Sequence, residues 1–177
     1  MSTKAVKLAF SGVLCALSVT VLFLGSLFPL VEYAIPTLSG LCLIPIVIEI
    51  DRKYAFLAFA AASATGLIVV PRKEFALLFL LFLGYYPIVK SYVESKFRFI
   101  AEWALKLGLF NAGMIAAFFV SINLLSIPKE EFSIGGVYLP WLLLLAGNGA
   151  FIIYDLAITR VVMLYIKLLH PFFKRIF

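Results

Sequence analysis

Charged residues are scarce in this 177-residue chain, in which Asp, Glu, Lys and Arg together make up 14% of the sequence. Soluble domains carry about 25% charged and roughly 45–50% apolar residues, whereas this chain is 64% hydrophobic. Its apolar residues fall in continuous runs rather than in the alternating pattern of barrel strands, so they predict membrane-spanning helices. The sequence therefore excludes a soluble globular domain and predicts an integral membrane protein.

The sequence also lacks the residue patterns of membrane enzymes and of metal sites. It contains no paired His–Glu zinc motif, no Gly-x-Ser-x-Gly elbow, no Walker sequence and no aspartate cluster for magnesium. The single histidine, His170, lies near the C-terminus, and Asp155 is the one carboxylate far inside an apolar run. A lone acid without a His or Cys partner offers little for catalysis. We therefore expect no enzymatic activity, no cofactor and no metal ion.

Cysteine is rare as well. Cys15 and Cys42 both fall inside apolar runs, where we expect small packing residues rather than a disulfide or a metal pair. The net charge of +6 would suit a protein that binds nucleic acid, but the basic residues lie at the ends of apolar runs. Lys and Arg in such positions orient membrane helices. We therefore expect these charges to meet the lipid bilayer and not nucleic acid.

Six apolar runs predict an all-α fold, an integral membrane bundle of six transmembrane helices that forms a single domain over residues 1–177. The expected spans are about 6–27, 35–50, 54–70, 74–92, 100–125 and 139–169. Pro45 and Pro87 lie inside two of them, and both helices are expected to kink because proline removes a backbone hydrogen bond. The end of the longest loop, Ser133–Tyr138, predicts a small hairpin.

Lys and Arg are distributed unevenly between the two ends of these spans. With a cytoplasmic N-terminus, twelve of the fifteen basic residues fall on the cytoplasmic side, and the other side receives Arg72, Lys73 and Lys129. Cytoplasmic loops carry the excess of Lys and Arg, so the pattern predicts a multi-pass protein of the cell membrane with cytoplasmic N- and C-termini. One cytoplasmic-side lysine, Lys106, follows Glu102 by four residues, which places both on one helix face.

Few polar side chains lie inside the predicted spans, and each is costly to bury in lipid. Asn111 lies in the middle of the fifth span, and Asn148 lies in the outer half of the sixth. Two interpretations stay open for both: they hydrogen-bond a solute in a cavity, or they form an interhelical hydrogen bond that holds the bundle together. Asp155 and Arg160 lie deeper toward the cytoplasm, where a structural ion pair is favoured over a proton relay.

The pair Arg72–Lys73 breaks the charge rule on the outer side and has two interpretations. As a helix-end anchor it would meet lipid phosphates, whereas at the mouth of an outward cavity it would attract an anionic solute. Tyr33 and Trp141 lie on the same side, where aromatic residues are typical of the membrane interface but stack on a flat ligand if they face inward. The candidate substrate-binding residues are Asn148, Asn111, Arg72, Lys73, Tyr33 and Trp141.

The first span carries a strip of small residues. Ala5, Ala9, Gly12 and Ala16 recur at spacings of four, three and four, so they share one face of a helix with 3.6 residues per turn. Small residues let another helix approach closely, and helix association in lipid depends on such packing. We expect this strip to be the surface on which a membrane partner docks.

With these features the chain resembles the substrate-binding S components of energy-coupling factor (ECF) transporters. The resemblance is carried by the small-residue motif Gly12-Val13-Leu14-Cys15-Ala16 early in the first span, where two alanines are usual in that family. It implies a solute pocket near the outer face and capture of a vitamin or other trace nutrient. It also implies docking on a transmembrane coupling protein that is driven by two cytoplasmic ATPases.

An alternative of a different class is a membrane scaffold without a solute. In size, span count and hydropathy the chain is similar to the rod-shape-determining membrane protein D of the bacterial cell-wall elongation machinery. In that case the small-residue strip binds a permanent partner, and Asn111 and Asn148 serve to hold the bundle together. A small molecule that stays with the purified protein would separate the two hypotheses.

Overall fold

The computed structural model describes residues 3–28, 34–123, 133–134, 137–138 and 140–173, and these are almost entirely helical. The elements, in chain order, are α1 (Thr3–Gly25), α2 (Ala34–Leu41), α3 (Ile44–Glu49), α4 (Arg52–Val69), α5 (Lys73–Leu78), the π-helical turn η1 (Phe79–Leu83), α6 (Tyr86–Lys96), α7 (Phe99–Asn123), β1 (Ser133–Ile134), β2 (Val137–Tyr138), α8 (Pro140–Leu168) and α9 (His170–Phe173). The strands β1 and β2 pair antiparallel, which confirms the predicted hairpin.

Both helices that contain the predicted proline kinks are interrupted. Between α2 and α3 the helix breaks just before Pro45, which occupies the first turn of α3. The second interruption is broader: η1 widens the helix so that the Gly84 amide donates to the Phe79 carbonyl at 2.8 Å, and α6 then begins with Pro87 in its first turn. Proline is accepted in a first turn because the amide it lacks would have no partner there.

Glycine at position 40 is required where the two interrupted helices meet. A Cβ atom there would collide with the carbonyl oxygen of Leu83, the last residue of η1. Only a residue without a side chain allows α2 to approach the backbone of η1 this closely.

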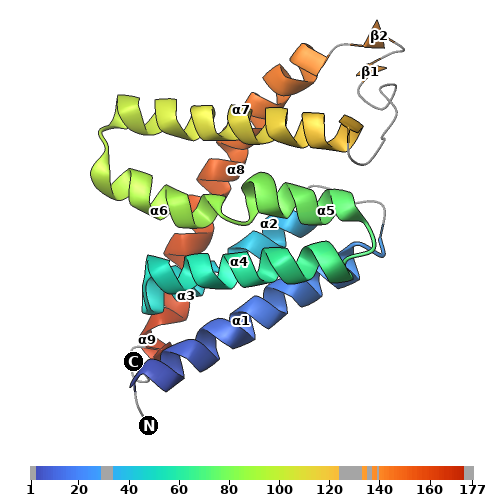
Figure 1. Cartoon of the computed structure of the whole chain (residues 1–177). Helices are drawn as coiled ribbons and strands as arrows, with labels where there is room; N and C mark the ends of the chain where they lie inside the picture. The colour runs from blue at the N-terminus through green and yellow to red at the C-terminus, as the bar shows by residue number, and fades with distance from the viewer. Residues whose placement is uncertain (1–2, 29–33, 124–132, 135–136, 139, 174–177) are drawn as a thin grey trace.

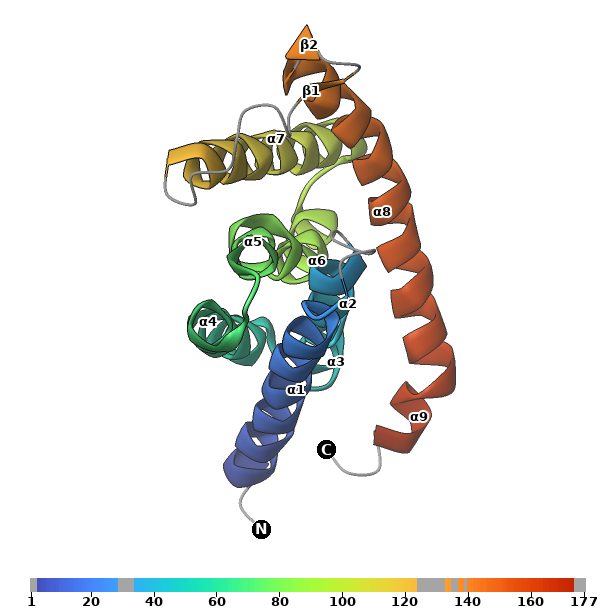
Figure 2. The same cartoon turned by 90° about the vertical axis from the view of Figure 1, so that its right-hand side faces the viewer.

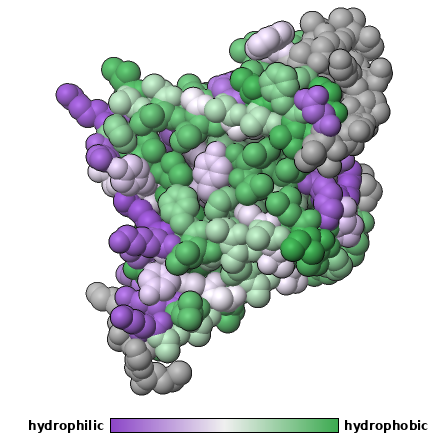
Figure 3. Space-filling view, viewed as in Figure 1, coloured by the Kyte–Doolittle hydropathy of each residue, from purple (hydrophilic) through white to green (hydrophobic). Residues whose placement is uncertain are grey.

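Four helical stretches are long and apolar enough to cross a membrane, namely Lys4–Gly25, Lys73–Lys96, Phe99–Asn123 and Trp141–Leu168. The interrupted stretch Ala34–Glu49 is apolar but shorter. On the face shown in Figure 3, hydrophobic residues fill the broad middle and hydrophilic residues gather toward the edges, most densely along the left. These features are those of a membrane-embedded protein.

The helices are arranged as a stack with one long helix along its side. Figure 1 shows α4, the α5–α6 segment and α7 one above another, with α1 running obliquely below them. In the perpendicular view, α8 extends along one side of this stack (Figure 2). The end of α9 returns to the start of α1, where the Phe10 and Phe173 rings meet edge to face at 5.4 Å. The chain therefore begins and ends its described helices on the same side.

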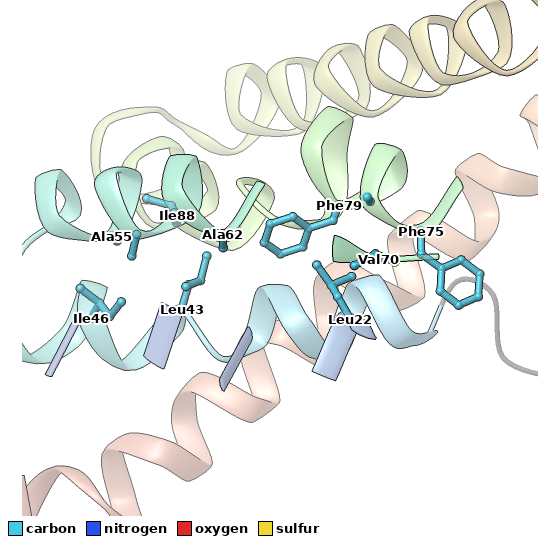
Figure 4. Packing of buried hydrophobic residues seen from close by; sticks show 11 residues of the cluster. Leu22, Leu43, Ile46, Ala55, Ala62, Val70, Phe75, Phe79 and Ile88 are labelled. Carbon is cyan, nitrogen blue, oxygen red and sulfur yellow. The ribbon is translucent and has the colours of Figure 1, made fainter. Parts of the chain in front are cut away.

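Two groups of buried side chains form the core. The first joins α1, α3, α4, α5, η1 and α6, and its members include Leu22, Leu43, Ile46, Ala55, Ala58, Ala62, Val70, Phe75, Phe79 and Ile88 (Figure 4). The second is rich in aromatic residues and joins η1 and α6 to α7 and α8 through Phe82, Tyr86, Phe110 and Phe151. The second core therefore lies directly beside the polar side chains described below.

The inward face of α1 is also built from small residues, which the sequence analysis did not single out. Ser11, Ser18 and Leu22 are buried, and the Cys15 thiol donates to the Ala58 carbonyl of α4 at 3.4 Å. Ser18 and Ser39 exchange hydrogen bonds between α1 and α2, each hydroxyl donating to the other's carbonyl at 3.1 and 2.8 Å. Both cysteines are free thiols, as predicted.

Candidate functional site

The most unusual feature of the interior is a cluster of ionised side chains between α6, α7 and α8. Asp155 of α8 is 3% exposed, and the two lysines that contact it, Lys90 of α6 and Lys106 of α7, are 3% and 1% exposed. Burying a charge in a membrane-embedded core is costly unless opposite charges and hydrogen bonds compensate it. The geometry of the cluster shows how that compensation is achieved.

Asp155 lies at the centre and accepts hydrogen bonds on both carboxylate oxygens. The Lys90 ammonium donates to Oδ1 at 2.6 Å, and the Lys106 ammonium donates to Oδ2 at 3.1 Å. The Tyr86 hydroxyl, one turn before Lys90 on α6, donates to Oδ1 as well. One carboxylate therefore connects α8 to both neighbouring helices.

Two further carboxylates complete the cluster toward the surface. Glu94 Oε1 accepts from Lys90 at 2.5 Å and from Lys106 at 2.7 Å, and Glu102 accepts from Lys106 at 2.7 Å. The Glu94 side chain is 38% exposed and that of Glu102 is 18% exposed, so the cluster reaches the surface through its acids. The i, i+4 pair predicted for Glu102 and Lys106 is confirmed.

The predicted partner of Asp155 was wrong, because its cations are Lys90 and Lys106. The predicted cation, Arg160, lies five residues further along α8 and is exposed. A spacing of five turns the two side chains to different sides of a helix, whereas lysines from α6 and α7 reach Asp155 directly. A structural ion pair at Asp155 was therefore predicted, but its cations come from α6 and α7 and not from α8.

A signal in the sequence was available for Lys90. Tyr86, Lys90 and Glu94 follow one another at intervals of four, so they line one face of a helix, and a lysine there is positioned to neutralise a buried acid. The aromatic core shields this face, since the Tyr86 ring lies 5.1 Å from Phe151 and 5.6 Å from Tyr154 of α8. The Tyr154 hydroxyl is buried and has no hydrogen-bond partner among the described residues.

The two predicted intramembrane asparagines form a second polar contact between α7 and α8. The Asn111 amide donates to Asn148 Oδ1 at 2.9 Å, and the Asn148 amide donates back to Asn111 Oδ1 at 3.0 Å. Each amide uses its other hydrogen on its own helix, donating to the Leu107 and Leu144 carbonyls at 2.8 Å. All four amide hydrogens are therefore engaged within the protein, as the interhelical interpretation requires.

Arg72 and Lys73 lie where the chain turns from α4 into α5. The Lys73 ammonium donates to the last carbonyls of α4, those of Leu67, Ile68 and Val70, at 2.8, 3.2 and 3.0 Å. A cation in this position donates to carbonyls that have no partner within the helix. It also interacts favourably with the negative end of the helix dipole. Lys73 therefore caps α4.

Arg72 is held by its own neighbours along the chain. Its guanidinium lies 3.4 Å from a Glu74 carboxylate oxygen and 5.0 Å from the centre of the Phe75 ring. Of the two aromatic candidates, Trp141 is 77% exposed at the start of α8. Tyr33 lies outside the described residues. The structure thus brings Asn111 and Asn148 together and places Trp141 on the surface.

The small-residue strip of the first helix lies on the outside of the described structure. Ala5, Ala9, Gly12 and Ala16 are all exposed. Apart from the backbone of α1 itself, no described atom lies within 4 Å of the position that a Cβ of Gly12 would take. The helix packs on α4 and α2 through a different face, about 120° away, which contains Ser18. The strip is therefore not used in packing among the residues that the structure describes.

Comparison with known proteins does not assign the chain to a family: no family model, no curated protein and no solved structure matches it. Among the described residues, no group of three or more His, Cys, Asp or Glu side chains is placed to hold a metal ion.

Proposed function

We propose that this protein is a substrate-binding S component of an ECF-type importer, a multi-pass protein of the cell membrane with six spans and cytoplasmic termini. It would capture a vitamin or other trace nutrient at the outer face. It would deliver the nutrient through a transmembrane coupling protein that is driven by two cytoplasmic ATPases. The observation that carries this proposal is the exposed small-residue face of α1.

Three features of the molecule support the proposal. The strip Ala5, Ala9, Gly12 and Ala16 is free of packing within the described chain, so a partner helix has access to it. α1 begins and α9 ends on the same side, which an even number of crossings requires (Figure 1). The sequence has no Walker motif, so an ATP-driven role would need ATPases on other chains.

The docking step is tested by placing a bulky side chain in the strip. In the Gly12→Leu variant we expect the coupling protein and ATPases to be lost when the protein is purified from native membranes in mild detergent. The matched control is Gly108→Leu on α7, where a Cβ also meets no atom within 4 Å. If both variants keep the partners, or both lose them, α1 is not the docking face.

Solute capture is tested on the isolated protein. A solute at 100 times its dissociation constant stabilises the folded state by about 2.7 kcal/mol, which raises the melting temperature. We expect one vitamin-like compound to produce this shift in the native protein and in Gly12→Leu alike, because docking and capture use separate surfaces. A complete panel of trace nutrients without any shift would contradict the transport proposal.

A scaffold role is the second candidate, and one observation favours it. Asn111 and Asn148 are candidate solute-binding residues, but they donate all their amide hydrogens to each other and to carbonyls of their own helices. A scaffold resembling the rod-shape-determining membrane protein D needs such internal contacts and no cavity. It predicts a stable complex with a membrane partner that survives without any solute and contains no ATPase.

A further inference from the structure

A pocket opens between the start of α4 and the middle of α6. It has a volume of about 340 Å³ and is lined by Arg52, Lys53, Phe56, Val89 and Tyr92. Arg52 and Lys53 are adjacent at the first turn of α4, and the other three lining residues are apolar or aromatic. The surface that the five residues present to the pocket is apolar, so the two cations line it with the carbon atoms of their side chains. Phe56 and Tyr92 are 42% and 43% exposed, so their rings are accessible from outside the bundle.

The guanidinium at this pocket is held in place by α6. Arg52 Nη2 donates to the Ser91 carbonyl and to the Ser95 hydroxyl, both at 3.1 Å. The same guanidinium lies 5.5 Å from the centre of the Tyr92 ring. Both hydrogen bonds use Nη2, which leaves the donors on Nη1 and Nε for an anion. A fixed guanidinium loses little conformational entropy when one of these remaining donors binds a phosphate oxygen.

The charge around the pocket is positive. Lys53 is exposed, and the Lys96 ammonium lies 5.3 Å from the centre of the Tyr92 ring, on which Arg52 also packs. The nearby carboxylate of Glu94 is occupied by two buried lysines. Asp51 precedes Arg52 in sequence but does not line the pocket.

The position of the pocket indicates which kind of anion would bind, a lipid or a soluble ion. The first turn of α4 lies on the left in Figure 1, the side on which hydrophilic residues gather in Figure 3. From there α4 continues with apolar residues on the outside. Leu57 and Ile68 on that helix are 68% and 79% exposed. A ligand with a charged head and a long apolar tail would satisfy both parts, whereas a soluble anion would leave Phe56 in contact with water.

We propose that this pocket binds the glycerol and upper acyl carbons of an anionic phospholipid, with the phosphate beside the pocket and the acyl chains lying along α4. The lipid phosphate contacts Arg52 and Lys53, and Phe56, Val89 and Tyr92 contact the glycerol and upper acyl carbons. This site is independent of any solute or docking partner. It would fix the depth of α4 in the membrane and strengthen the contact between α4 and α6.

The test is lipid binding by the delipidated full-length protein in detergent, measured by native mass spectrometry with phosphatidylglycerol and phosphatidylcholine of identical chains. We expect one phosphatidylglycerol to bind in preference to phosphatidylcholine. Each cation near a membrane surface contributes about fivefold to the affinity for an anionic lipid, so Arg52→Gln/Lys53→Gln should weaken phosphatidylglycerol binding by about 25-fold. Lys53 makes no hydrogen bond within the described chain. The single variant Lys53→Gln should therefore weaken phosphatidylglycerol binding about fivefold without loosening α4 from α6.

The control is Lys4→Gln/Lys7→Gln, which removes the same charge from the start of α1 and leaves the pocket intact. This variant should retain phosphatidylglycerol binding. Equal binding of the two lipids, or equal loss in the control and the pocket variant, would overturn the proposal. Displacement of the lipid by millimolar inorganic phosphate would show that the site takes a soluble anion and would overturn the lipid assignment.

Discussion

Two polar contacts join α8 to its neighbours, and they solve the problem of burying polar groups differently. The Asn111–Asn148 pair needs two residues, because an amide carries both donors and an acceptor and two amides can satisfy each other. The cluster around Asp155 needs three helices, because a carboxylate only accepts and an ammonium only donates. The neutral pair is complete in itself, whereas removal of one member of the charged cluster leaves a buried charge uncompensated.

The largest effect is expected from Asp155→Ala. This change leaves the ammonium groups of Lys90 and Lys106 without their most buried partner, so the free energy of unfolding should fall by about 3–5 kcal/mol. The measurement is equilibrium unfolding in mixed micelles with a denaturing detergent. The matched control is Arg160→Ala on the same helix, which should change stability little because Arg160 is exposed. Equal losses in both variants would contradict the assignment of the cations.

A smaller effect is expected from Tyr86→Phe, which removes one hydrogen bond to the Asp155 carboxylate and keeps the aromatic packing. Hydrogen bonds to charged groups contribute about 1.5–3 kcal/mol, and we expect a loss in that range in the same unfolding measurement. The control is Tyr154→Phe, since the Tyr154 hydroxyl has no partner among the described residues. A larger loss for Tyr154→Phe than for Tyr86→Phe would show that the hydroxyl of Tyr154 carries the contact.

Substitutions in the Asn111–Asn148 pair should lower the free energy of unfolding less than Asp155→Ala does, and the two single changes should not be additive. Asn111→Leu leaves the Asn148 side chain short of a partner and should cost about 1–2 kcal/mol of unfolding free energy. The double variant Asn111→Leu/Asn148→Leu should cost less than the sum of the two single changes, because no unpaired amide remains. Strict additivity would mean that the two amides do not depend on each other. Loss of solute binding in the double variant with full stability would instead assign the pair to a solute.

The smallest effect is expected at the exposed edge of the cluster. Glu94→Gln weakens the contacts with Lys90 and Lys106, but its side chain is 38% exposed and water screens the interaction. The cost should stay below about 1 kcal/mol and should shrink further in high salt. A loss as large as that of Asp155→Ala would show that the cluster is closed to solvent at Glu94.

Much of the helical framework was predictable from the sequence because its causes are local. The observed boundaries fall within a few residues of the predicted spans, and Pro45 and Pro87 mark both interruptions. The rest of the fold follows from packing: α7 and α8 lie against the aromatic second core, and Phe110 stacks on Phe151 at 4.8 Å. The hydropathy pattern of a uniformly apolar helix does not indicate which of its faces meets which neighbour.

The candidate site was less predictable for the same reason. Asn111 and Asn148 were identified because polar residues in apolar runs are conspicuous, but their mutual pairing requires α7 and α8 to be in register. Lys90 was not among the predicted site residues, although it is nearly fully buried. The exposed strip on α1 was predicted by its spacing, and the structure shows that a second face of the same helix makes the internal contacts.

The sequence by itself determined that this is a helical membrane protein, since length, hydropathy and proline placement act within each segment. Tertiary structure decided which charges meet. Asp155 lies 65 residues from Lys90 and 49 from Lys106, and neither separation leaves a periodic signal in the chain. Their contact exists because three helices converge, and a buried charge is stable only where opposite charges from other segments reach it.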